Sequence, residues 1–329
     1  MLTFDYQRAG SVADAISRVS AEGARFYAGG TNLLDLMKSG VESPAVLVDV
    51  RGLGLNEIEE TAAGGITIGA GATNSAVANH ALVRNRYPVL SQAILSGATT
   101  QIRNMATVGG NLMQRTRCPY FMNPATGPCH KRVPGSGCAA RDGFHREHAV
   151  FGTSLPCVAV HPSDMVVALA ALDAVVHVTG PDGARAIGIR DFYVSPAAPS
   201  DPDTCLRPGE LIVAVELPPS PFKSHSWYLK VRDRHSYAFA LVSVAAAVHL
   251  DDGVIVSAAV ALGGVAATPW RVPAAEAALT GQAPHRQAFE AAAEVVLAGA
   301  SPLQHNGFKV TLAKNSVVRA LSEATARTS

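Results

Sequence analysis

Hydrophobic residues in the first fifty positions follow two spacings, one typical of helices and one typical of strands. Residues 11–22 repeat apolar positions at helical intervals. A short strand-like run follows, is broken by Gly29-Gly30, and leads into a second helical segment at 33–38. Residues 45–50 (AVLVDV) have the apolar run of a buried strand. This order predicts a βαβ-like beginning with a glycine turn between strand and helix.

The middle of the chain continues to alternate between the two spacings. A short strand is expected within 64–72, followed by a helix around 77–83 and another helix over 88–105. Regular patterning resumes at 165–180, where a short helix runs into a strand, and 211–218 predicts a further strand.

Beyond about residue 222 the pattern changes. Two long runs of small and β-branched residues, at 238–250 and 253–264, precede alanine-rich helical segments at 274–298 and 307–325. This order predicts an antiparallel sheet backed by helices, which is a separate α+β domain.

One stretch, residues 114–163, shows no sustained period. It contains six prolines and several glycines. A structureless loop of this length is uncommon in a compact domain and is normally functional.

Composition and charge exclude several classes of protein. Hydrophobic residues make up 48% and charged residues 16% of the 329 positions, which is typical of globular chains. The formal net charge is +1 and Lys and Arg are scattered, so no basic stripe suggests nucleic-acid binding. No apolar run reaches the roughly 18 residues of a membrane-spanning helix. The beginning lacks an export signal, which favours the cytoplasm, or the periplasm if a partner subunit carries the signal.

Two glycine segments have the composition of phosphate-binding turns. AGGTNLL (28–34) and ATVGGNL (106–112) each place paired glycines and small polar residues in front of a short helical run. Backbone amides in such turns, together with a helix N-terminus, suit a phosphate or pyrophosphate. Neither segment matches G-x-G-x-x-G or the Walker pattern, and tight turns use the same residues, so the residues alone favour ordinary turns.

Four of the five cysteines fall within the irregular stretch. Cys118, Cys129, Cys138 and Cys157 are spaced C-x10-C-x8-C-x18-C, and Cys205 lies outside. The spacing matches neither a zinc finger nor a bacterial ferredoxin. Spacing alone leaves a disulfide-stapled loop, a zinc site and an iron–sulfur cluster open.

The two glycine segments together resemble a known family. A-G-G-T-N-L-L near residue 30, followed by I-R-N-x-A-T-V-G-G-N-L near residue 110, is similar to the medium, FAD-binding subunit of xanthine dehydrogenases, carbon monoxide dehydrogenases and aldehyde oxidoreductases. The similarity extends through KVRDRHSYAFALVSVAAAV and ALGGVAATPWR to the C-terminal region.

The resemblance implies an α+β fold with two parts. Residues 1–221 would form an FAD-binding domain of the vanillyl-alcohol-oxidase/PCMH type, divided into subdomains 1–55 and 56–221. Residues 222–329 would form the smaller C-terminal domain.

The resemblance also implies which residues contact FAD. In the family the two glycine motifs wrap the pyrophosphate and the neighbouring part of the cofactor. The implied contacts are Phe26, Tyr27, Ala28, Gly29, Gly30, Thr31, Asn32, Leu33, Leu34, Thr107, Gly110 and Asn111.

Three more positions match the family by motif. Asp164 corresponds to an acidic residue that hydrogen-bonds the polar chain of the flavin, Ile212 to an aliphatic residue on the isoalloxazine, and Lys230 to a lysine near the flavin edge. The residues alone favour structural roles: a helix N-cap for Asp164, plain core for Ile212 and a solvated strand residue for Lys230. Gly97 departs from members that place an aromatic ring over the flavin.

The cysteine stretch resembles the insert of bacterial molybdenum aldehyde oxidoreductase flavin subunits. That resemblance implies a [4Fe–4S] cluster held by Cys118, Cys129, Cys138 and Cys157, because each iron takes one cysteine sulfur. Cys205 is then a bystander. The histidines in and beside the stretch are expected to make surface hydrogen bonds, with a histidine ligand in place of one cysteine as the alternative; they are His130, His145, His148 and His161.

The implied function is electron transfer within a complex. In the family a large partner carries molybdopterin, a small partner carries two [2Fe–2S] clusters, and FAD passes electrons to an external acceptor. No catalytic side chain is assigned to this chain. Two alternatives remain from the sequence: a self-contained flavin oxidase, and a zinc- or disulfide-stapled assembly protein without enzymatic activity.

Overall fold

The N-terminal part is a small parallel sheet in the computed structural model, which describes residues 1–153 and 155–326. The strand order is β1-β3-β2, and both outer strands run parallel to the central one. A βαβ connection brings the strands into this arrangement, as the sequence predicted. The elements are β1 (Asp5–Arg8), α1 (Val12–Val19), β2 (Ala24–Tyr27), α2 (Leu33–Lys38) and β3 (Val46–Asp49).

The middle part contains a five-stranded sheet in the order β4-β5-β8-β6-β7, with every neighbouring pair antiparallel. Its strands are β4 (Ile58–Glu60), β5 (Ile66–Gly69), β6 (Val175–Gly180), β7 (Gly183–Gly188) and β8 (Leu211–Leu217). Its helices are α3 (Asn74–Asn79), α4 (Ala81–Arg86), α5 (Pro88–Ser96), α6 (Thr100–Arg103), α7 (Val108–Leu112), α9 (Asp164–Ala171) and α10 (Ile189–Phe192).

The C-terminal part is a four-stranded antiparallel sheet in the order β12-β11-β10-β9, with three helices on one side. The prediction of an antiparallel sheet backed by helices is therefore confirmed. The elements are β9 (Ser226–Val231), β10 (Val242–Asp251), β11 (Val254–Gly263), β12 (Trp270–Arg271), α11 (Pro273–Leu279), α12 (Arg286–Leu297) and α13 (Phe308–Thr325).

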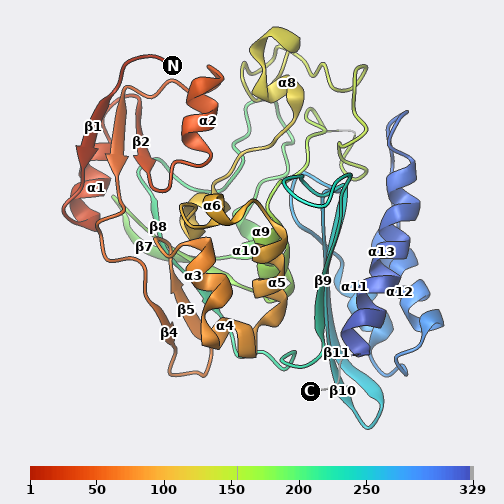
Figure 1. The fold of residues 1–329 in the computed structure, drawn as a ribbon. Coiled ribbons are helices and arrows are strands. Elements are labelled where there is room, and N and C mark those ends of the chain that lie inside the picture. Colours follow the sequence, from red (N-terminus) through yellow and green to blue (C-terminus); the bar gives the residue numbers. More distant parts are fainter. Residues whose placement is uncertain (154, 327–329) are drawn as a thin grey trace.

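The two larger sheets enclose a helical layer. Helices α5 and α9 lie between the five-stranded sheet and the strands β9–β11, while α11–α13 cover the far side of the second sheet (Figure 1). Every residue of α9 is buried, which fits its position between two sheets. This packing rigidly joins the middle and C-terminal parts. The domain borders expected at residues 55 and 221 stay a prediction.

The irregular stretch lies at one end of this sandwich, beside the N-terminal sheet (Figure 1). Its described residues, 114–153 and 155–163, contain two short helices, α8 (Pro119–Met122) and η1 (Pro124–Thr126), as the lack of periodicity predicted. Among the described residues no helix is long and apolar enough to cross a membrane.

Three predicted helical segments are interrupted: the one around 77–83 is divided between α3 and α4 at the extended His80, and 274–298 is divided between α11 and α12. Residues 88–105 form two helices, because the chain is extended at Gly97 and the side chain of Thr99 caps the second helix by accepting from the amide of Ile102. The break brings Gly97 beside Asp164: a Cβ added at Gly97 would lie 3.2 Å from Asp164 Oδ2.

Candidate functional site

The first glycine segment presents unpaired backbone amides. It leaves β2, turns through Gly30 with a φ of +71°, and enters α2 at Leu33. In the described part of the chain, no acceptor pairs with the amides of residues 29–32. The side-chain Nδ2 of Asn32 is also buried without a partner, whereas its Oδ1 accepts from the Arg115 amide at 3.0 Å. Backbone amides without acceptors in one turn can donate to an anionic group.

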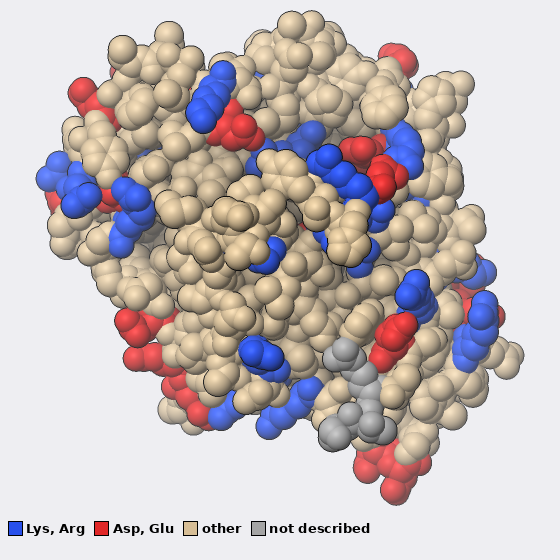
Figure 2. Space-filling view, in the orientation of Figure 1, with Lys and Arg blue, Asp and Glu red and all other residues tan. Residues whose placement is uncertain are grey.

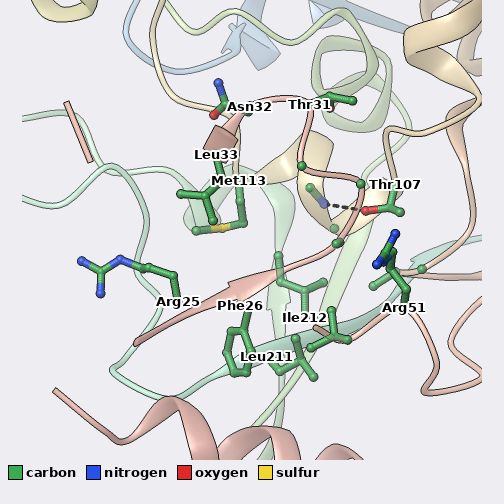
Figure 3. Close-up of a pocket in the computed structure, with 18 of the residues that line it drawn as sticks. Arg25, Phe26, Thr31, Asn32, Leu33, Arg51, Thr107, Met113, Leu211 and Ile212 are labelled. Carbon is green, nitrogen blue, oxygen red and sulfur yellow. Dashed lines mark hydrogen bonds between the residues drawn. The ribbon is translucent and has the colours of Figure 1, made fainter. Parts of the chain in front are cut away.

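The second glycine segment supports the first one. A Cβ at Gly29 would lie 1.9 Å from the carbonyl oxygen of Met105, so the two backbones touch where only glycine fits. Thr107 caps α7, its side chain accepting from the Gly110 amide at 3.2 Å (Figure 3). The amides of residues 108 and 109 donate to the carbonyls of Ala72 and Ala70. The amides of this segment are therefore already paired, and the first segment supplies the open donors.

Both segments line one cavity of about 300 Å³. Phe26, Leu211 and Ile212 lie together on one side of it and Thr31 and Asn32 on the other (Figure 3). The cavity brings together ten of the fifteen residues expected to contact FAD: Phe26, Ala28, Gly29, Gly30, Thr31, Asn32, Leu33, Thr107, Gly110 and Ile212. It is not lined by the other five, namely Tyr27, Leu34, Asn111, Asp164 and Lys230.

Several lining residues were not anticipated from the sequence. They include Arg25, Leu36, Arg51, Met113, Arg115, Leu206 and Leu211. Leu211 adjoins the predicted Ile212, and Arg51 directly follows a predicted strand. Their positions at the ends of strands were therefore the sequence feature that could have identified them as lining residues.

The arginines at this cavity are already paired. Arg51 donates to Asp49 at 2.9 Å and stacks on the Tyr27 ring at 5.2 Å. Burial raises the pKa of Asp49, but hydrogen bonds from Arg51 and Tyr6 outweigh it and lower the pKa to about 2. Arg115 is held by Glu42 and Asp203. The hydrogen-bond donors left open to an anion at the turn are therefore the backbone amides of residues 29–32, and Arg51 and Arg115 are already engaged by carboxylates.

Asp164 and Lys230 form a buried ion pair outside the main cavity. Lys230 Nζ lies 2.7 Å from Asp164 Oδ2, and the side chains are 4% and 9% exposed. The hydroxyl of Tyr228 donates to the other carboxylate oxygen at 2.7 Å. Ser163, not Asp164, is the N-cap of α9, and Lys230 is not solvated.

This pair is connected to the second glycine segment. The Ser163 hydroxyl donates to Asn111 Oδ1 at 2.5 Å. Asn111 thus links α7 to the beginning of α9. There Asp164 lines a smaller cavity of about 100 Å³ and lies beside Gly97, which is outside the lining of that cavity.

Lys230→Met should destabilise the fold by roughly 3 kcal/mol, because it leaves the Asp164 carboxylate buried without its cation. Chemical denaturation should show a lower free energy of unfolding. The control is Lys314→Met, which removes a pair with Glu294 whose side chains are 39% and 67% exposed. That variant should change stability far less, since solvent screens exposed pairs. Equal effects of the two substitutions would contradict a structural role for the buried pair.

The four clustered cysteines line one small cavity of about 10 Å³. Cys118 is the N-cap of α8, and Cys129 and Cys138 face each other in an isolated antiparallel bridge. Cys157, from the last part of the same stretch, completes the lining. All five cysteines are free thiols. Cys205 lies elsewhere, packed against the core of the middle part.

Burial raises the pKa of two of the loop thiols. It raises the pKa of Cys118 to about 12 against the opposing effect of the Phe121 and Tyr120 amides, and it also raises the pKa of Cys157. The described residues contain no group of three His, Cys, Asp or Glu side chains arranged around a single metal ion.

The expectation of surface histidines is wrong for two positions. His145 and His148 are only 2% and 3% exposed. His145 stacks on His305, and His148 Nε2 lies 3.1 Å from Cys118 Sγ. Burial lowers the pKa of His148 to about 4, with smaller contributions in the same direction from Lys309 and His145. No local pattern in the sequence predicts the contact between His148 and Cys118, because thirty residues separate them.

Comparison with family descriptions covers almost the whole chain. Residues 2–220 match the FAD binding domain in molybdopterin dehydrogenase, and residues 227–324 match the CO dehydrogenase flavoprotein C-terminal domain. Charged side chains of both signs are interspersed on the face in Figure 2, consistent with the scattered charge of the sequence.

Individual proteins agree with these matches. The chain is 52% identical over 329 residues to the aldehyde oxidoreductase FAD-binding subunit PaoB of Escherichia coli K12, covering 99% of this chain and 100% of that protein. It is 30% identical to the carbon monoxide dehydrogenase medium chain of Afipia carboxidovorans, covering 91% and 88%. The structure of reconstituted CO dehydrogenase from Oligotropha carboxidovorans superposes with a TM-score of 0.78 at 28% identity, covering 100% of both chains. The chain therefore belongs to the family of FAD-binding flavoprotein subunits of the molybdopterin dehydrogenases.

Proposed function

We propose that this chain is the FAD- and [4Fe–4S]-containing electron-transfer subunit of a molybdenum-dependent aldehyde oxidoreductase. The observation that carries the FAD assignment is the row of unpaired amides at residues 29–32, which line the main cavity. The aldehyde assignment is supported by the 52% identity to an aldehyde oxidoreductase subunit over its full length.

The pyrophosphate of FAD would be bound by the first glycine segment, with the second segment holding that turn in place. The residues that line this cavity and are proposed to hold the cofactor are Phe26, Ala28, Gly29, Gly30, Thr31, Asn32, Leu33, Thr107, Gly110 and Ile212. Tyr27, Leu34 and Asn111 adjoin them and are proposed to support the same contacts from outside the cavity lining. Tyr27 acts from beneath the turn, where a Cβ at Gly30 would approach its ring to 2.8 Å. Asp164, which lines the smaller cavity, and its buried partner Lys230 are also proposed to contact the flavin.

The four cysteines around one cavity support the cluster. In a [4Fe–4S] cluster each thiolate binds its own iron, so the sulfurs need not converge on one point as they do around zinc. The cavity between them is smaller than a cluster, so the loop must widen as the cluster assembles. The turn between Cys129 and Cys138 is largely exposed and has room to move outward.

The substrate would be oxidised in a partner subunit. We propose a large molybdopterin subunit and a small subunit with [2Fe–2S] clusters, in the cytoplasm or, by co-export with a partner, in the periplasm. When bound, FAD supplies the conversion between one-electron and two-electron transfer. The side chains of this chain bind and orient the cofactor, and none is assigned an acid or base role.

The purified chain should contain about one FAD and about four irons with four sulfides, and should not oxidise aldehydes with an artificial acceptor unless the partners are added. Cofactor analysis, a visible spectrum and a dye-linked assay check this. Flavin bands without iron would refute the cluster alone. Aldehyde oxidation by the isolated chain would refute the relay role in favour of a self-contained oxidase. A colourless protein with zinc or disulfides would refute both cofactors.

A further inference from the structure

Residues 147–149 of the cysteine loop are held by hydrogen bonds from two residues at the beginning of α13. We call this set of hydrogen bonds the clamp. The buried ammonium of Lys309 donates to the carbonyls of His148 at 2.8 Å, Glu147 at 3.2 Å and Gly264 at 2.5 Å. Asn306 Nδ2 donates to the carbonyls of His148 at 3.2 Å and Ala149 at 3.0 Å. Lys309 and Asn306 are both fully buried. Two buried donors on one carbonyl fix the backbone of His148.

The clamped backbone directs the His148 ring at one sulfur. Nε2 lies 3.1 Å from Cys118 Sγ, within the range of an N–H···S hydrogen bond, and Nδ1 is buried without a partner. A ligating thiolate only accepts, so Nε2 must carry the hydrogen. Among the four loop cysteines, as far as the structure describes them, no other sulfur receives a side-chain hydrogen bond.

Cys118 lies on the less movable side of the loop. It caps α8, whose Phe121 is buried, and the neighbouring core includes Leu36. Residues 133–136, in the turn between Cys129 and Cys138, are exposed. Widening of the loop during cluster assembly would therefore move that turn more than the Cys118–His148 contact.

We propose that His148 is a positioning residue for the cluster: its Nε2–H donates to the Cys118 sulfur and raises the reduction potential of the cluster. The inference rests on the proposed cluster. A hydrogen bond to a ligating sulfur withdraws negative charge, and the reduced cluster, which carries one more electron, gains more from it than the oxidised cluster.

The test is a potentiometric titration of the full-length chain, followed by electron paramagnetic resonance of the reduced cluster. His148→Phe keeps a planar ring and removes the donor. We expect unchanged iron content and an about tenfold lower ratio of reduced to oxidised cluster at a fixed potential, equivalent to ~59 mV for one electron. His148→Gln restores an N–H donor and should recover much of the shift.

The outcomes separate the two proposals. Unchanged potential in His148→Phe, with iron intact, overturns the role of His148 and leaves the cluster. Loss of about one iron in that variant would make His148 a ligand and also overturn the hydrogen bond. Wild-type protein without iron refutes the proposed function itself.

A measurement on the unmodified protein covers the case in which His148→Phe fails to fold. With ¹⁵N-labelled histidine, double resonance of the reduced cluster should show a weak nitrogen coupling and one exchangeable proton. A strong coupling, typical of direct coordination, or no coupling at all, overturns the proposal.

Discussion

Gly30→Val should purify with little or no flavin. Gly30 has a φ of +71°, which a β-branched residue rarely adopts, and its new Cβ would lie 2.8 Å from the Tyr27 ring and 3.0 Å from Leu34. The turn must change its backbone to relieve both, and the amides of residues 29–32 would no longer converge. We expect FAD affinity to fall at least about tenfold, equivalent to ~1.4 kcal/mol, measured by flavin content and by titration of the apoprotein.

The chain offers a matched control at the other end of the same helix. Gly40 has a φ of +72°, and a Cβ there would meet nothing within 4 Å. Gly40→Val therefore imposes the same backbone strain without the clash and outside the cavity. It should lower stability and leave flavin content near that of the wild type. Full flavin in Gly30→Val, or equal losses in both variants, would contradict the role assigned to the turn.

Local patterns in the sequence predicted the elements around the main cavity well. The boundaries 33–38 of the second helix are confirmed, because Gly29-Gly30 ends the strand and a periodic apolar segment follows at once. The helix expected at 88–105 was too long, because apolar periodicity continued across Gly97. The capping side chain of Thr99 marks the break and was the overlooked local signal.

Contacts between segments that are distant in the sequence could not be predicted in this way. Family resemblance selected Asp164 and Lys230, but nothing in their surroundings along the chain indicates that they pair with each other. The Gly29–Met105 contact depends on how two turns pack, and the same is true of the clamp that Lys309 forms on residues 147 and 148. Such contacts are created by tertiary packing, to which periodicity and turn chemistry are insensitive.

Replacing any one of Cys118, Cys129, Cys138 and Cys157 by Ser should strongly reduce iron content and lower the midpoint of thermal unfolding. All four line one cavity in a stretch with little regular structure, so the cluster would supply cross-links that the loop otherwise lacks. Iron and sulfide analysis of the purified variants measures the first effect, and calorimetry the second. Flavin should remain, because residues 29–32 lie in another segment.

Cys205→Ser is the control for this series, because Cys205 packs against the core of the middle part, outside the cysteine cavity. It should retain the iron of the wild type, since the substitution leaves all four proposed ligands in place. Iron loss in the four loop variants but not in Cys205→Ser would assign the ligands individually. Normal iron in all four, zinc in place of iron, or disulfides between these cysteines would each rule out the cluster. The outcome also decides whether residues 114–163 fold around a cofactor, in addition to the bridge between Cys129 and Cys138 and the hydrogen bonds and ion pairs of the described loop residues.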